Sequence, residues 1–97
     1  MPVFSGEVTG IVVNFPNSHF HAPGGNIIGI FPNASPEFAH EFTQCVGIIF
    51  RRGGQTSHGA IVAREFGIPA LIDRHATDIP DGSRLHLNAS KGEWRLE

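Results

Sequence analysis

The sequence predicts an α/β domain with a mixed sheet, and three observations support this fold class. Short β-branched or apolar runs alternate with segments that carry helix-start and helix-stop residues. Near the end of the chain, two strand-like runs flank a turn, as in an antiparallel hairpin. The length of 97 residues suits one domain. We therefore expect a single domain over residues 1–97, with a strand–helix alternation closed by a hairpin.

The first half of the chain predicts two strands and a short helix. Strands are expected at residues 7–13 and 26–31, separated by a loop rich in Asn, Pro and Gly. Gly10 interrupts the first of these strands and indicates a bulge. Ser35 begins a Ser-Pro-Glu sequence that supplies an N-cap, a proline at the first helical position and an acid in the first turn. This helix should run to about Phe42.

The second half of the chain predicts one longer helix among further strands. The continuous apolar run at residues 46–50 is typical of a strand covered on both faces. Ser57 is placed to cap a helix that ends before Gly67, the residue type that most often stops one. The remaining strands are expected at residues 69–73, 85–87 and 93–96.

Charge is distributed unevenly along the chain, and the basic residues are too few to form a nucleic-acid-binding surface. The net charge is −2, yet all seven Lys and Arg residues lie at or beyond position 51. Binding to a phosphate backbone needs many basic contacts in register, and this chain has too few for that purpose. Arg51, Arg52 and Arg64 form a local cluster that is sufficient for one small anion.

Several other function classes are excluded by the sequence. It contains no run of 18 apolar residues and no signal peptide, so we expect a cytoplasmic domain without a membrane partner. Cys45 has no partner for a disulfide and is expected to be a small core residue. His19 and His21 alternate in a loop without a third ligand, so no metal site is predicted. The start at Met1 and the end after the hairpin favour a free subunit or an excised domain.

The candidate functional residues lie in the segment that joins a buried strand to the longer helix. Gly53 and Gly54 allow backbone amides to approach a bound group closely. His58 stands at the expected helix start, where unpaired N–H groups and the helix dipole favour an anion. A phosphoryl group on its ring would be stabilised there. Taken alone, such a histidine is more often a cap or a packing residue, and Ser57 is more plausibly an N-cap than a nucleophile.

Residues 53–70 closely resemble the signature of the phosphohistidine swivelling domain of the PEP-utilising enzymes. That family includes phosphoenolpyruvate synthase, pyruvate phosphate dikinase and the first enzyme of the bacterial sugar phosphotransferase system. Its pattern is Gly-Gly-x-Thr-Ser-His-Ala-Ala-Ile-x-Ala-Arg, followed by Ile-Pro-Ala. The likeness is strong over residues 46–82 and implies a compact swivelling β/β/α fold with a mixed sheet. Gly59 replaces the usual Ala, at a cost of up to about 1 kcal/mol in helix propensity.

The resemblance implies a role for each matching residue. His58 is the phosphoryl acceptor, and Thr56 matches a threonine that a regulatory kinase phosphorylates in some members. The phosphate environment implied in this way consists of Gly53, Gly54, Thr56, Ser57 and Arg64. For Arg64, a salt bridge on the helix surface is as plausible as a phosphate contact. If the domain carries phosphorylated His58 between two active sites, a partner domain must approach the histidine closely. Gly53, Gly54 and Gly59 are expected to leave room for that partner.

The resemblance further implies a phosphoryl carrier that is not a complete enzyme alone. The family's ATP-grasp-like nucleotide domain and its PEP-binding barrel cannot fit in 97 residues. Partner domains or subunits would therefore hold ATP or PEP together with Mg²⁺, and no cofactor is expected on this domain. One alternative is a non-catalytic scaffold or interaction module that retains the swivelling fold. A subtilisin-like protease, suggested by the sequence Ser-His-Gly at Ser57, fails on length and on the missing serine site.

Overall fold

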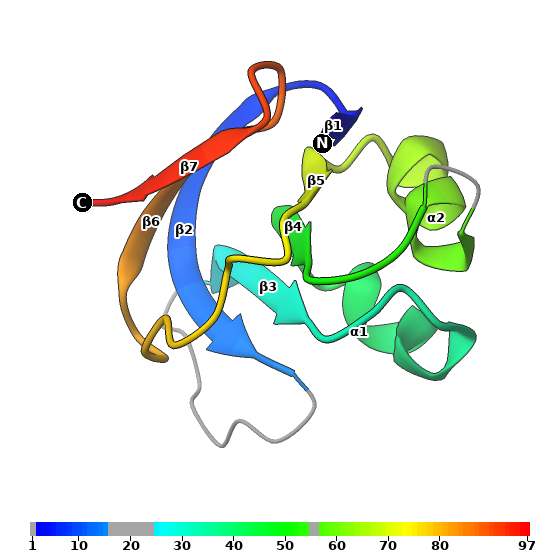
Figure 1. Ribbon diagram of the computed structural model, residues 1–97, viewed down its shortest axis with the longest axis horizontal. Coiled ribbons are helices and arrows are strands. Elements are labelled where there is room, and N and C mark those ends of the chain that lie inside the picture. The colour runs from blue at the N-terminus through cyan, green and yellow to red at the C-terminus, as the bar shows by residue number, and fades with distance from the viewer. Residues whose placement is uncertain (1, 16–24, 55–56) are drawn as a thin grey trace.

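The computed structural model describes residues 2–15, 25–54 and 57–97 (Figure 1). Its strands are β1 (Pro2–Phe4), β2 (Glu7–Asn14), β3 (Ile27–Phe31), β4 (Gly47–Phe50), β5 (Ala70–Ile72), β6 (Arg84–Asn88) and β7 (Glu93–Leu96). Its helices are the 3₁₀-helix η2 (Pro36–Phe38), α1 (Ala39–Phe42) and α2 (His58–Phe66). The predicted α/β class is confirmed.

All seven described strands form one mixed sheet in the order β1-β5-β4-β3-β2-β6-β7. The central strands β2, β3, β4 and β5 run parallel to one another. The strands outside them add in the antiparallel sense, β1 on β5, β6 on β2 and β7 on β6. The two parallel steps from β3 to β4 and from β4 to β5 are made through α1 and α2, as parallel neighbours require a crossover. The carboxyl ends of β3, β4 and β5 therefore meet at one edge of the sheet.

Apolar side chains of the central strands pack on both faces of the sheet. In β4, Ile48 and Phe50 face the core that the helices cover, while Ile49 faces the opposite core. Phe31 and Phe42 meet edge to face with ring centroids 4.7 Å apart in the helix-side core. Because both faces of β4 are buried, its side chains form a continuous apolar run rather than an alternating one. The predicted double burial of this strand is confirmed.

Helix α2 has the bounds that its local sequence signals predict. Ser57 is the N-cap residue, with φ −67° and ψ 160°. At the other end, Gly67 adopts the left-handed conformation with φ +67°, and its N–H reaches the carbonyls of Ala63 and Arg64. A residue with a Cβ is disfavoured in that conformation, which explains why glycine ends the helix here.

Three sequence expectations differ from the structure. Strand β1 was not expected; it is a three-residue strand whose stability comes from pairing with the distant β5. The segment that follows Ser35 divides into η2 and α1 instead of forming one helix. The bulge expected at Gly10 is wrong, because β2 and β6 pair in unbroken register. Glycine is required there because a Cβ would lie 2.7 Å from the backbone oxygen of Asn26.

The sheet curls so that residues from strands near its two ends come into contact. The indole Nε1–H of Trp94 in β7 donates to Oδ2 of Asp73, which follows β5, over 2.8 Å. The N–H of His75 donates to the other carboxylate oxygen over 2.8 Å. Burial acts to raise the pKa of Asp73, but these two hydrogen bonds and the neighbouring His75 hold it below its ordinary value. The ionised carboxylate thus helps to close the curl.

Replacing Trp94 by Phe should remove this indole donor and raise the pKa of Asp73 toward its ordinary value near 3.8. A lowered pKa stabilises the folded state above that value, and the stabilisation is lost as pH falls through the folded-state pKa. The variant should therefore lose about 1 kcal/mol at pH 7 through the missing bond. Urea unfolding at several pH values measures this loss.

The matched control is the double variant Trp94→Phe with Asp73→Asn. Lost indole packing does not depend on pH, whereas the hydrogen bond to an ionised carboxylate does. The difference between Trp94→Phe and the wild-type chain should therefore shrink as the pH falls below about 3.8. On the Asp73→Asn background, the effect of Trp94→Phe should be the same at every pH in this acidic range. A pH-independent loss on both backgrounds would contradict this account of the contact.

Candidate functional site

The candidate site begins with the glycine pair that follows β4. Gly53 has φ +142°, a backbone conformation that other residues rarely adopt. A Cβ at this position would lie 3.5 Å from Oγ of Ser57, so the loop folds back onto the start of α2. A Cβ at Gly54 would meet no atom within 4 Å. The surface at the glycine pair is therefore exposed beside the first turn of α2.

His58 is the first residue of α2 and is exposed to solvent. Within the part of the chain that the structure describes, its side chain has no hydrogen bond or ion pair. Ser57 occupies the N-cap position, so His58 is not the capping residue. Neither of its commoner structural roles, capping and core packing, applies here. The imidazole is free to meet a reactant or a partner.

The first turn of α2 retains donors that an anion can use. The hydroxyl of Ser57 does not cap the helix but donates to the carbonyl of Gly54 over 2.7 Å. The N–H of Gly59 donates to the carbonyl of Ala34 over 2.9 Å. Among the described residues, the N–H groups of His58 and Ala60 have no acceptor. These groups and the helix dipole favour negative charge beside the His58 ring.

Gly59 fixes where this first turn lies on the sheet. A Cβ at Gly59 would stand 2.8 Å from the ring of Phe50 and 2.8 Å from Cβ of Ala34. Real Cβ atoms do not approach other atoms so closely, so glycine lets the helix rest directly on the end of β4. The sequence expectation that Gly59 leaves room for a partner is wrong, because this position is buried.

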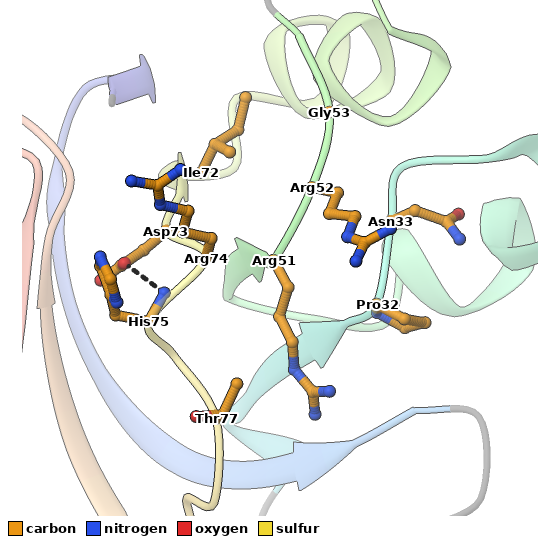
Figure 2. Close-up of a pocket in the computed structure, with 10 residues that line it drawn as sticks. All are labelled: Pro32, Asn33, Arg51, Arg52, Gly53, Ile72, Asp73, Arg74, His75 and Thr77. Atoms are coloured by element: carbon orange, nitrogen blue, oxygen red, sulfur yellow. Dashed lines mark hydrogen bonds between the residues drawn. The ribbon is translucent and has the colours of Figure 1, made fainter.

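A hollow of about 980 Å³ lies at the carboxyl ends of β3, β4 and β5, next to the glycine loop (Figure 2). Its lining residues are Pro32, Asn33, Arg51, Arg52, Gly53, Ile72, Asp73, Arg74, His75 and Thr77. Gly53 belongs both to this lining and to the loop that leads to His58. The hollow and the exposed imidazole therefore lie on the same edge of the sheet.

The structure brings some of the predicted site residues together and separates others. Gly53, Gly54, Ser57 and His58 lie at the start of α2, as their order in the chain requires. Arg64 lies exposed in the last turn, roughly 9 Å further along the helix axis, and does not line the hollow. Thr56 lies outside the described residues, as do His19 and His21.

Arg74 and His75 line the hollow and were missed by sequence reasoning. They directly follow a predicted strand, as Arg51 and Arg52 follow the preceding one. Because the carboxyl ends of parallel strands meet at one edge, this shared position was the signal that could have identified them.

The described ranges contain one cysteine, Cys45, as a further reactive group. Cys45 is buried and is a core residue, as predicted. Because it is buried, the pKa of its thiol is raised to about 12, so the reactive thiolate is disfavoured. Residues 2–15, 25–54 and 57–97 contain no group of three His, Cys, Asp or Glu side chains suited to a metal ion. None of the helices described in these ranges is long and apolar enough to span a membrane.

Comparison with known proteins adds independent information about the chain. The family model described as "PEP-utilising enzyme, mobile domain" matches residues 23–92. Rifampicin phosphotransferase of Bacillus subtilis is 29% identical over 97 residues, which cover 95% of this chain and 11% of that protein. Phosphoenolpyruvate synthase of Aquifex aeolicus is 40% identical over 60 residues, 60% of this chain and 7% of that protein. The chain thus spans about a tenth of the length of these relatives.

Solved structures share the fold at low sequence identity. An NMR structure of Enzyme I matches with a TM-score of 0.62 and 22% identity over 76% of this chain and 32% of that one. Aconitase X of Thermococcus kodakaraensis matches with a TM-score of 0.73 and 16% identity over 99% of this chain and 94% of that one. Since proteins with different names share the architecture, the fold by itself does not specify the chemistry.

Replacing Gly59 by Ala should destabilise the chain even though alanine is the better helix former. The gain in helix propensity is at most about 1 kcal/mol. Forcing a methyl group against Phe50 and Ala34 should cost about 1–3 kcal/mol and displace the first turn. Thermal or urea unfolding should therefore show a net loss, whereas Gly54→Ala, which meets nothing within 4 Å, should change stability little.

Phe50→Leu provides the second arm of this test. A smaller side chain beneath the helix makes space for the added methyl group, so the two substitutions should not be additive. The double variant should be more stable than the sum of the single losses predicts, by at least about 0.5 kcal/mol. Strict additivity, or a Gly59→Ala variant as stable as the wild-type chain, would rule out the proposed contact.

Proposed function

The chain belongs to the family of PEP-utilising enzyme mobile domains, and from this membership we propose that it is a phosphoryl carrier whose acceptor is His58. In this proposal the domain takes a phosphoryl group at one site and delivers it at another. The two sites are a nucleotide site and a PEP or substrate site on partner domains. The domain is then a component of a phosphotransferase or dikinase and not a complete enzyme.

The observation that carries the proposal is the exposed imidazole of His58 at the first residue of α2, which has no partner in the ranges 2–15, 25–54 and 57–97. A nucleophile in phosphoryl transfer must present a ring nitrogen to the phosphorus atom in line with the departing oxygen. A ring engaged by a carboxylate or buried in the core could not do so. The exposed ring of His58 is compatible with this requirement, and the tight packing of Gly59 holds the helix end that carries it in place.

The transfer step follows from ordinary nucleophilic chemistry. The lone pair of an imidazole nitrogen forms the N–P bond while the P–O bond of the donor breaks, and the bonding electrons leave with the donor oxygen. Delivery reverses the sequence: an acceptor oxygen attacks phosphorus and the N–P electrons return to the ring. No base on this domain is required for the first step, because a neutral imidazole already has a free lone pair.

The start of α2 is suited to hold the charge that the phosphoryl group brings. The N–H of His58, which has no acceptor within the described residues, supplies a donor at the positive end of the helix dipole. Gly53 and Gly54 place no side chain between this turn and solvent, which leaves access for a bulky donor. In the proposed carrier, these features stabilise phosphohistidine without sequestering it.

The partners follow from what this chain lacks. We infer an ATP-grasp-like nucleotide domain and a PEP- or substrate-binding domain, either fused to this domain or in separate subunits. Mg²⁺ and ATP or PEP would be held by those partners, and the domain itself would carry no cofactor. Ile61, one helical turn from His58 and 44% exposed, offers an apolar contact for docking. The proposed setting is cytoplasmic and involves neither nucleic acid nor a membrane.

Two narrower roles complete the proposal. Thr56, two residues before His58, is a candidate for regulatory phosphorylation by its match to the family motif. Arg64 is exposed in the last turn of α2 and is therefore accessible to a docked partner. In this proposal it contacts a phosphate group that the partner holds. The alternative, a scaffold that retains the fold without the chemistry, would not need an unpartnered His58.

Replacing His58 by Ala tests the proposal. The wild-type chain, given radiolabelled PEP or ATP with partner domains, should acquire label that is labile in acid and stable in alkali. Because the imidazole is the proposed nucleophile, His58→Ala should abolish the label while the fold stays intact. Alanine suits a helix and His58 makes no contact that folding needs.

The matched controls are His40→Ala and His75→Ala, which remove other exposed imidazoles. Both should still acquire label. Label that persists in His58→Ala, or that disappears with either control, would refute the assignment of His58. A chain that acquires no label with either donor would support the scaffold alternative.

A further inference from the structure

We propose that the hollow bounded by Arg51, Arg52, Arg74 and His75, here called the arginine hollow, is a second site that binds a small phosphate monoester. This site goes beyond the carrier role, because it does not require His58 to accept a phosphoryl group.

The sheet itself brings the arginines together. Phe50 at the end of β4 pairs with Ile72 at the end of β5, so the residues after these two strands leave the sheet side by side. The N–H of Arg51 donates to the carbonyl of Phe31 over 2.9 Å, which fixes the start of the segment after β4. The N–H of Asp73 donates to the carbonyl of Phe50 over 2.8 Å and fixes the segment after β5. Rigid strand ends therefore fix the backbone from which the arginine side chains extend around the hollow, each in a different direction (Figure 2).

The arginines around the hollow lack counter-ions. Within the part of the chain that the structure describes, Arg51, Arg52 and Arg74 form no ion pair. The single carboxylate in the lining, that of Asp73, already accepts a hydrogen bond from the N–H of His75 (Figure 2). It also accepts one from the indole of Trp94. Like charges around one hollow repel each other unless an anion lies between them.

Arg51 supplies a more specific sign of an absent ligand. Its Nε is buried, yet it has no hydrogen-bond partner among residues 2–15, 25–54 and 57–97. Buried polar atoms in folded proteins nearly always have a partner, because losing water without replacing its hydrogen bond costs free energy. An anionic oxygen in the arginine hollow could accept this bond and a second one from the same guanidinium group.

The charge and size of the hollow select the class of ligand. Three guanidinium groups against one carboxylate leave two positive charges when His75 is counted as neutral. A phosphate monoester at pH 7 carries between about 1.5 and 2 negative charges, which matches this excess. The volume of about 980 Å³ exceeds what a phosphate group alone would fill. Asn33 and Thr77 offer further polar contacts for the organic part of the ester.

Amide-resolved NMR titration of the 97-residue chain with glycerol 3-phosphate tests this site. Saturable shifts should appear at residues 51–53 and 72–77, which line or adjoin the hollow. Arg51→Gln and Arg74→Gln should each weaken binding by about tenfold, because each removes a charge-assisted hydrogen bond. Arg74 is exposed, so this second variant keeps the test valid even if Arg51→Gln affects folding.

The controls separate this site from general charge effects and from the carrier role. Arg84→Gln removes an exposed arginine outside the hollow and should leave the affinity unchanged within twofold. His58→Ala should bind glycerol 3-phosphate as the wild-type chain does, even if His58 proves not to be a phosphoryl acceptor. Succinate, a dianion without phosphorus, should bind at least tenfold more weakly.

Several results would overturn the proposal. Shifts that grow linearly without saturation would show a general salt effect. Equal weakening in Arg84→Gln and Arg74→Gln, or equal affinity for succinate, would remove the specific site. Loss of binding in His58→Ala would place the phosphate at the start of α2 instead of in the arginine hollow.

Discussion

The close contact between the first turn of α2 and the end of β4 is the constraint on which the site depends. Gly59 lies against the ring of Phe50 and the methyl group of Ala34, and its N–H donates to the carbonyl of Ala34. No other residue type could approach so closely without moving the helix. The backbone of His58 is consequently held in a fixed position relative to the end of β4, while its ring is exposed to solvent. Precise placement and exposure of the histidine thus follow from the same contact.

The exposed imidazole of His58 lies on the same edge of the sheet as arginines that form no ion pair within the described part of the chain. Gly53 belongs to both regions, since it lines the arginine hollow and contacts the N-cap of α2. Strand ends position the arginines, whereas a helix end positions the histidine, so the two regions can bind different groups. The aromatic core below them, with Phe31 and Phe42 packed edge to face, makes the supporting body rigid. Rigidity suits a domain that carries a reactive group between partners.

Much of the fold could be predicted from the sequence where the signals are local. The end of α2 follows from Gly67, because its capping chemistry depends only on neighbouring residues. The start falls at Ser57 as predicted, although the Ser57 hydroxyl bonds to the carbonyl of Gly54 instead of capping the helix. Strand β1 could not be found in this way, because three residues form a strand only through their pairing with β5. The need for glycine at position 59 was also missed, since it arises from Phe50 on another element. His58 was proposed from its motif, which is local, whereas Arg74 reaches the lining of the hollow through strand register.

The most direct test of the central claim is to observe a bond between phosphorus and a ring nitrogen of His58. The chain would be labelled with ¹⁵N-histidine, phosphorylated through its partner domains, and examined in alkaline solution by ³¹P–¹⁵N correlation NMR. The account predicts one ³¹P signal coupled to one ring nitrogen, which is assigned to His58 by its absence from the His58→Ala spectrum. A coupling assigned to another histidine, or a ³¹P signal with no nitrogen coupling, would contradict the account.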